Sequence, residues 1–145
     1  MSTYSKPISF RWSDLDPNLH VRHSVYYDLG TQHRVEILDE AGLTMVAMHK
    51  MGFSPILFRE ECVFRREMRF GDEVTLETKI LKLKRDASRW SIQHRFLLGE
   101  MLCATITIDG SWIDMKTRKL ASPPPQAAID VMNAFPKSEG FVWEE

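Results

Sequence analysis

Residues 14–23 read DLDPNLHVRH and bring together the side chains of this chain best suited to chemistry. Asp16, Asn18 and His20 stand two positions apart, so in an extended loop their side chains point the same way. A carboxylate acts as base or nucleophile, an amide orients water or a carbonyl, and an imidazole gives or takes a proton. These parts suit acyl transfer or hydrolysis.

A helix predicted from residue 25 to residue 41 directly follows this loop. Ser24 fits its N-cap and Gly42 its C-terminal stop. The first N–H groups of the helix, around Ser24, Val25 and Tyr26, carry the positive end of the helix dipole. They can polarise a carbonyl and hold a developing oxyanion. We therefore expect the helix N-terminus to form part of the site.

Two metal-binding interpretations of the loop fit poorly. Asp14, Asp16 and Asn18 have the spacing that opens a calcium loop, but Leu19 replaces the turn glycine and Val25 the closing glutamate. A transition-metal site would need His20 and His23 together with His33, which lies further along the helix, and no HExxH or paired-cysteine pattern supports it. The sequence predicts no metal site.

A purely structural interpretation remains for single residues of the loop. Asp14 and Asp16 would form Asx-turns around Pro17, and Ser24 or His23 would cap the helix. This does not account for a carboxylate, an amide and an imidazole two positions apart. We therefore interpret Asp14 and His23 as the turn and cap residues that orient the catalytic series.

The elements around the loop predict an α+β fold, with one antiparallel sheet wrapped around one long central helix. The strands expected from apolar alternation are 7–13, 56–70, 74–83, 89–98 and 101–113. The alternation slips at Ile80-Leu81, where a bulge would restore it. Residues 43–55 are ambiguous and could hold a short helix, and a terminal helix runs from about Pro125 to Phe135. Gly30, inside the long helix, predicts close packing against another backbone.

Composition sets the broad class of the protein. The 145 residues are 43% hydrophobic with a net charge of −1, which suits one domain spanning 1–145 and calls for neither nucleic acid nor an anionic membrane. No apolar run reaches the length of a signal peptide or a membrane span, so a cytoplasmic location is expected. Cys62 and Cys103 are expected to be reduced and buried. One sheet with one main helix leaves apolar surface and strand edges uncovered, which predicts a homo-oligomer, a dimer or tetramer.

The stretch DLDPNLHVRHSVYYDL resembles the signature of hotdog-fold acyl thioesterases, in both the 4-hydroxybenzoyl-CoA and the acyl-ACP branches. The resemblance implies a curved antiparallel sheet around the central helix, with Asp16 as the catalytic carboxylate and Asn18 and His20 beside it. A second stretch, FRREMRFGDEV, is similar to a segment of the acyl-ACP enzymes and places Glu67 on their catalytic glutamate. Met68 stands where they carry a cysteine, and Glu60 and Glu61 are rivals of Glu67 on the same predicted strand.

The resemblance also suggests how an acyl carrier would bind. The turn KLKRDASR is basic, and in the aromatic acyl-CoA branch a similar turn meets the nucleotide phosphates. The corresponding residues here are Lys82, Lys84, Arg85 and Arg89, which would otherwise form an ordinary solvated turn. Coenzyme A would enter only as part of the substrate, and no separate cofactor is expected.

The sequence thus predicts hydrolysis of an acyl-CoA or acyl-ACP thioester. Asp16 would activate water or attack directly, and the helix N-terminus would polarise the carbonyl. Two alternatives stay open: an acyl-thioester hydratase or dehydratase of the same fold, and a non-catalytic acyl-CoA binding module. Only hydrolysis releases free thiol. Candidates for the acyl pocket are apolar residues of the long helix and of the ambiguous segment 43–55: Tyr26, Tyr27, Met45, Met48, Met51 and Phe53.

Overall fold

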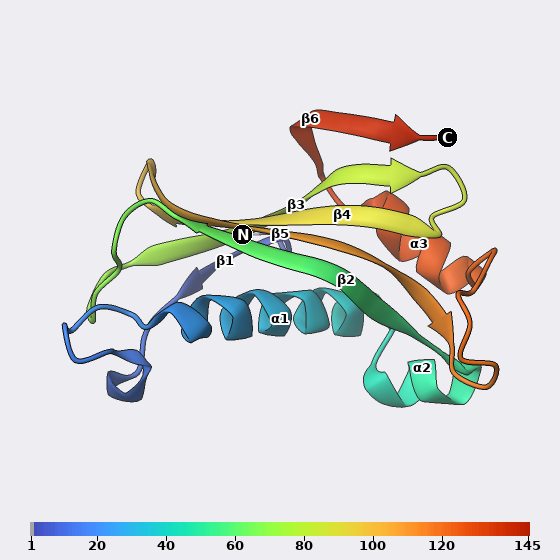
Figure 1. The fold of residues 1–145 in the computed structure, drawn as a ribbon, viewed down its shortest axis with the longest axis horizontal. Helices are drawn as coiled ribbons and strands as arrows, with labels where there is room; N and C mark the ends of the chain where they lie inside the picture. The colour runs from blue at the N-terminus through green and yellow to red at the C-terminus, as the bar shows by residue number, and fades with distance from the viewer. Residues whose placement is uncertain (1) are drawn as a thin grey trace.

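The computed structural model describes residues 2–145, which form one six-stranded sheet with α-helices packed against it (Figure 1). The strand order is β1-β3-β4-β5-β2, and β6 pairs in parallel with β3. The other pairs are antiparallel. The elements are β1 Ser5–Ile8, a 3-10 helix Trp12–Asp14, α1 His23–Glu40, α2 Met45–Met51, β2 Phe53–Phe64, β3 Val74–Lys84, β4 Arg89–Leu98, β5 Met101–Asp114, α3 Gln126–Ala134 and β6 Lys137–Glu144. The predicted hotdog fold is confirmed.

The inward face of the sheet follows the predicted alternation. In β3 the residues from Val74 to Ile80 alternate buried and half-buried. The predicted bulge is present, because Ile80 pairs with Ile92 and Lys82 with Ser91, so that Leu81 has no partner on β4. These inward side chains form one core under α1, which lies across this face of the sheet (Figure 1).

Helix α1 is central and begins earlier than predicted. Arg22 occupies the N-cap position, makes no side-chain cap, and donates its backbone N–H to the carbonyl of Asp14 at 2.8 Å. Ser24 is therefore a first-turn residue and not the cap. A Cβ at Gly30 would lie 3.1 Å from the ring of His94, so the close contact is with a side chain of β4 and not with another backbone.

The boundaries of two other predicted strands were wrong. The expected strand 7–13 stops at Ile8, because Asp14 accepts the backbone N–H of Arg11 at 2.8 Å and closes a 3-10 turn that leaves Trp12 81% exposed. The expected strand 56–70 ends at Phe64. Strand β6 was not predicted. The short helix left open in residues 43–55 is α2.

The two cysteines are free thiols in different surroundings. Cys103 is buried as expected, whereas Cys62 is half-buried on the edge strand β2. Burial raises the pKa of the Cys62 thiol to about 11 and also raises that of Cys103, so neither is activated as a nucleophile. No helix within residues 2–145 has both the length and the apolar character needed to cross a membrane.

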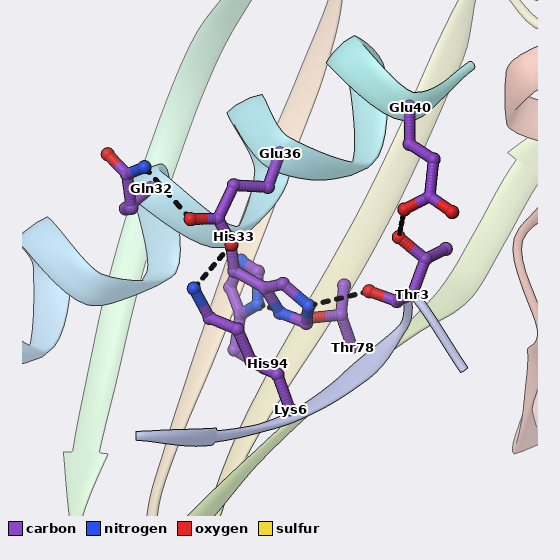
Figure 2. Close-up of polar contacts among 8 residues, drawn as sticks. All are labelled: Thr3, Lys6, Gln32, His33, Glu36, Glu40, Thr78 and His94. Carbon is purple, nitrogen blue, oxygen red and sulfur yellow. Dashed lines mark hydrogen bonds and ion pairs between the residues drawn. The ribbon is translucent and has the colours of Figure 1, made fainter. Parts of the chain in front are cut away.

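A buried polar network joins α1 to the sheet and to the N-terminal segment (Figure 2). The hydroxyl of Thr78 lies 2.7 Å from Nδ1 of His33 and 2.6 Å from Nδ1 of His94. Nε2 of His33 lies 2.9 Å from the carbonyl of Thr3, and Nε2 of His94 lies 2.8 Å from Arg34. His33, Thr78 and His94 are all buried.

The groups at the two ends of the network, Arg34 and the Thr3 carbonyl, determine which nitrogen of each imidazole carries a proton. Arg34 only donates, so Nε2 of His94 accepts and its Nδ1–H donates to Thr78. The Thr3 carbonyl only accepts, so Nε2 of His33 carries its proton and Nδ1 accepts from the Thr78 hydroxyl. Both imidazoles are therefore neutral. Burial is the main cause that lowers the pKa of His33 and of His94, and Arg34 lowers that of His94 further.

Candidate active site

The loop before α1 is held by its own backbone. The backbone N–H of Asp16 donates to the carbonyl of His20, its carbonyl accepts the N–H of Leu19, and Leu19 adopts a left-handed φ of 65°. One carboxylate oxygen of Asp16 accepts the N–H of Asn18 at 2.8 Å and that of His20 at 3.2 Å. This Asx-turn fixes the carboxylate and leaves its second oxygen free of a partner within residues 2–145.

The segment after β2 brings Glu67 to this loop. The N–H of Val21 donates to the carbonyl of Met68 at 2.8 Å, and His20 forms a bridge with Arg69, so the two segments run antiparallel. Nε2 of His20 then lies 2.9 Å from the carboxylate of Glu67. Arg69 is the main cause that lowers the pKa of Glu67, and His20 adds to it.

The N-terminus of α1 supplies hydrogen-bond donors beside this pair. The Val25 N–H is taken by the carbonyl of Arg22 at 3.0 Å. The N–H groups of His23 and Ser24 have no acceptor within the part of the chain that the structure describes. Tyr26 is buried at the base, with its ring edge-on to Phe64 at a centroid distance of 4.9 Å. Burial raises the pKa of Tyr26 to about 12, so its phenol stays neutral.

These groups line one open cleft of about 310 Å³. The predicted residues Asp16, His20, Tyr26 and Glu67 line it, whereas the predicted Ser24 and Val25 do not. The cleft also takes in His23, which we had interpreted only as a cap. Its lining consists of Asp16, His20, Val21, His23, Tyr26, Phe64, Arg65, Arg66 and Glu67. A carboxylate, an imidazole–carboxylate pair and free N–H donors around one space can activate water and stabilise an oxyanion.

Other predicted residues lie elsewhere. Asn18 is exposed and lines a neighbouring hollow with Trp12, Leu19 and Phe70. The two rivals of Glu67 have other partners: Glu60 lies 3.7 Å from Arg34 and Glu61 lies 2.7 Å from Arg59. Asp14 is buried in the 3-10 turn, as a turn residue should be.

The predicted acyl-pocket residues do not converge on the cleft. Tyr26 lines it, whereas Met45, Met48 and Phe53 line a separate apolar pocket of about 360 Å³ between α1, α2 and the start of β2. Tyr27 and Met51 line neither of these two spaces. The sequence pattern shows that these residues are apolar, but it does not show which end of α1 each side chain lies near. It therefore could not separate the cleft from the apolar pocket.

The predicted basic turn and the cleft lie at opposite ends of the sheet. The β3–β4 turn follows Lys84, whereas the cleft adjoins the end of β2, and ten residues of strand span about 33 Å. Its cations also diverge, because Arg85 stacks on Trp143 of β6 at 4.4 Å and Arg89 on Phe58 of β2 at 4.8 Å. Lys82 is exposed and Lys84 half-buried.

Three arginines that sequence reasoning left unassigned lie beside the cleft instead. Arg65, Arg66 and Arg69 line a groove of about 530 Å³ next to Glu67. Arg69 is paired with Glu67, while Arg65 and Arg66 have no ion-pair partner within residues 2–145. The sequence FRREMRF shows this run of charge, but a charged run most often marks a solvated face, so it gave no specific signal.

Neither metal interpretation of the loop is supported by the geometry. His33, the third histidine of the transition-metal alternative, faces Thr3 and Thr78 in the core. Among residues 2–145, no group of three histidine, cysteine, aspartate or glutamate side chains is arranged to hold a metal ion.

Residues 10–134 match the family model described as the thioesterase-like superfamily. The chain belongs to this superfamily. The matched residues include the cleft and every strand that positions it, and only β1 and β6 lie outside them. The general chemistry of this thioesterase-like protein is therefore thioester hydrolysis. No curated protein matches the chain.

Solved structures share the fold of this thioesterase-like protein at low sequence identity. A 1,4-dihydroxy-2-naphthoyl-CoA thioesterase from Synechocystis is 18% identical, with a TM-score of 0.79 over 90% of this chain and 96% of that one. A gentisyl-coenzyme A thioesterase is 18% identical, with a TM-score of 0.74 over 88% and 98%. A DHNA-CoA thioesterase from Staphylococcus aureus is 17% identical, with a TM-score of 0.70 over 81% and 78%.

Proposed function

We propose that this protein hydrolyses an acyl-CoA thioester to a free acid and a thiol, in the cleft at the N-terminus of α1. The observation that carries the proposal is the convergence of Asp16, the His20–Glu67 pair and His23, the first residue of α1, on one space. The structural relatives named as CoA thioesterases agree with this substrate class.

Asp16 is the proposed base or nucleophile. Its bound oxygen is anchored by two backbone N–H groups, so the free oxygen has a fixed position from which to take a proton from water. The water oxygen attacks the carbonyl carbon, the carbon–sulfur bond breaks, and the proton passes to the leaving thiolate. The free N–H of His23, at the N-terminus of α1, binds the oxyanion formed in between.

Glu67 is the proposed positioning residue for His20. Its carboxylate accepts the Nε2–H of His20, which selects the tautomer in which Nδ1 can take up a proton. His20 then orients the water or Asp16, or returns the proton to sulfur. Asn18 contributes through its backbone N–H, because its exposed side chain lines the neighbouring hollow.

The arginine groove is the proposed contact for the phosphates of the carrier. Arg65 and Arg66 are unpaired within the described residues and lie at the rim of the cleft. Guanidinium groups bind phosphates with paired hydrogen bonds, which suits the nucleotide end of coenzyme A. The basic turn at Lys82 and Arg89 is too far along the sheet to serve the cleft of the same chain.

We also infer that the protein is a homo-oligomer joined along β2. This strand ends the sheet, has no partner on its outer side within residues 2–145, and leaves Leu57, Phe58, Val63 and Phe64 exposed. An edge of this kind invites pairing with another copy. Since Phe64 lines the cleft, such a copy would cover part of it.

The decisive experiment measures thiol release from a panel of aromatic and aliphatic acyl-CoA substrates. We expect Asp16→Ala to lower kcat/KM by about 10³-fold, within the range for loss of a general base. The matched control is Asp130→Asn, an exposed carboxylate on α3 remote from the cleft, which should keep full activity. Unchanged turnover in Asp16→Ala would refute its role. Substrate consumption without thiol would favour a hydratase, and binding without consumption would favour a binding module.

A further inference from the structure

A hollow of about 390 Å³ borders the cleft on the outer side of the loop before α1. It shares His20 with the cleft, and Arg69 in its wall is paired with Glu67, which lines the cleft. A group held in the hollow would therefore lie next to the proposed site of hydrolysis. The apolar walls of the hollow are Trp12, Leu15, Leu19 and Phe70.

Three of these apolar side chains are unusually exposed. Trp12 is 81% exposed, Leu19 67% and Phe70 60%. Within residues 2–145, only two other large apolar side chains are exposed to this degree, Met45 and Val46 on α2. Single exposed apolar side chains are normal, but a group of them around one hollow marks a binding site.

The backbone holds these side chains in place. Trp12 stands on the 3-10 turn at the start of the loop. Leu19 adopts a left-handed φ of 65°, which is uncommon for residues other than glycine, asparagine and aspartate. Asp72 accepts the backbone N–H of Arg69 at 2.8 Å and so fixes the turn that carries Phe70. The exposure of the three side chains is therefore built into the fold, and the hollow is preformed.

The spaces on either side of the thioester differ in chemistry. The arginine groove borders the cleft through Arg65, Arg66 and Glu67, and its cations suit the phosphates of a carrier. The hollow borders the cleft through His20 and is mostly apolar. A thioester has its carrier on the sulfur side and its acyl group on the carbon side. With the carrier in the groove, the hollow is the apolar space beside the cleft that is left for the acyl group.

We propose that this hollow binds the hydrocarbon body of the acyl group, and that Trp12, Leu19 and Phe70 determine which acyl groups are hydrolysed. This inference rests on the proposed function. The thioester carbonyl lies in the cleft beside His20, and the chain beyond it contacts the three apolar side chains. Contact removes apolar surface of both partners from water, so a longer acyl group gains more than acetyl does.

The test compares kcat/KM for acetyl-, butyryl- and hexanoyl-CoA, measured as thiol release by the full chain. We expect kcat/KM to rise at least tenfold from acetyl to hexanoyl, because the added methylene groups are partly buried. Trp12→Ala should lower the ratio of hexanoyl to acetyl about tenfold, and Phe70→Ala about threefold. Val46→Ala, which shortens an equally exposed side chain that lines neither the cleft nor the hollow, is the matched control and should leave the ratio unchanged.

Leu19→Asn separates binding from folding. Asparagine adopts a left-handed φ more readily than leucine, so this variant should be at least as stable as the wild type in urea denaturation. The ratio of hexanoyl to acetyl should nevertheless fall about threefold, because the apolar contact is lost. A loss of stability with an unchanged ratio would show that Leu19 serves the fold and would overturn its assignment to the acyl group.

Two results would overturn the proposal while the chain still releases thiol. An equal loss of kcat/KM for all three substrates in Trp12→Ala would place the carrier in the hollow. A wild-type ratio in both Trp12→Ala and Phe70→Ala would exclude acyl binding there, and a smaller particle mass of Trp12→Ala in light scattering would then assign the hollow to contact between copies. The absence of thiol release from every acyl-CoA would instead refute the proposed hydrolysis, and this inference with it.

Discussion

The histidines of this protein occupy two opposite environments. His20 lies in an open cleft, keeps 33% of its side chain exposed, and has the carboxylate of Glu67 as its partner. His33 and His94 lie in the core, share the hydroxyl of Thr78, and have no carboxylate among their hydrogen-bond partners in residues 2–145. The same ring thus meets an anion and the open surface in one region, and a neutral hydroxyl and a cation in the other.

The difference shows what each region can do. An imidazole that is open to solvent and hydrogen-bonded to a carboxylate can reach a substrate and hand protons on, which suits catalysis. The buried pair is already ordered from Arg34 to Thr3, and a further proton on either ring would displace one of its bonds. The core network therefore stabilises the fold and the cleft performs chemistry, so variants in the two regions should separate stability from activity.

Thr78→Val should have the largest effect of those we consider. It removes the hydroxyl that joins the two rings and leaves Nδ1 of His94 and Nδ1 of His33 unpaired in the core. Each unpaired group costs about 1–3 kcal/mol, so we expect a loss of about 3 kcal/mol in the free energy of unfolding, measured by urea denaturation. Thr75→Val, on the outward side of the same strand, is the control. Equal effects of the two substitutions would show that the network contributes nothing.

The buried pair should also make stability depend on pH. Both histidines have folded pKa values below the ordinary 6.5, so the folded state keeps them neutral while the unfolded chain takes up protons. Their contribution is fully present above pH 6.5 and is lost as pH falls below it. Two such groups can give a slope of up to about 2.7 kcal/mol per pH unit.

Urea denaturation between about pH 7.5 and about pH 5.5 measures this slope. His49→Gln, which alters an exposed histidine on α2, should leave the slope unchanged and serves as the control. A free energy of unfolding that stays constant across this range would contradict neutral, buried rings at His33 and His94.

Glu67→Gln tests the opposite region. The amide cannot act as the anionic partner of His20, so we expect kcat to fall about 10- to 100-fold, at the low end of the range for acid–base groups. The free energy of unfolding should change by less than about 0.5 kcal/mol, because Glu67 is on the surface. The matched control is Glu61→Gln, which alters another exposed glutamate paired with an arginine. A similar loss of kcat in both variants would exclude a special role for Glu67.

Gly30→Ala should have the smallest effect. Alanine gains about 1 kcal/mol of helix propensity, but its Cβ would lie 3.1 Å from the ring of His94. That ring is held at both nitrogens and cannot yield, so the two effects should nearly cancel in a thermal or urea unfolding experiment. A clear stabilisation would mean that His94 moves freely.

The parts of the fold that were predicted correctly depend on local patterns. The alternation in residues 74–83 and 89–98 identified β3 and β4, and its slip located the bulge. Strand β6 was missed because its pairing with β3 joins segments far apart in the sequence. The 3-10 turn at Trp12 was missed because the contact between Asp14 and Arg11 outweighs the apolar alternation there.

For the site, proximity in the sequence decided what could be predicted. Asp16 and His20 belong to one loop, so their joint presence in the cleft was foreseeable, and the resemblance added Glu67. The arginines beside Glu67 were not assigned, because the contacts that bring this segment to the loop, Val21 with Met68 and His20 with Arg69, are visible only in the structure. The sequence could not show that the basic turn at Lys84 lies far from the cleft, because this distance depends on the strand order.

The bulge at Leu81 has a consequence for how this chain can change its length. Before it, the inward side chains of β3 fall on even-numbered residues such as Thr78 and Ile80, and after it Leu83 is buried. Deletion of residue 81 would restore the simple two-residue period, with Leu83 still facing the core and Lys82 and Lys84 still facing outward. Regular pairing of all residues without the bulge would instead turn Lys82 and Lys84 into the core. Position 81 is thus the place in β3 where one residue can be lost at the smallest cost to the core.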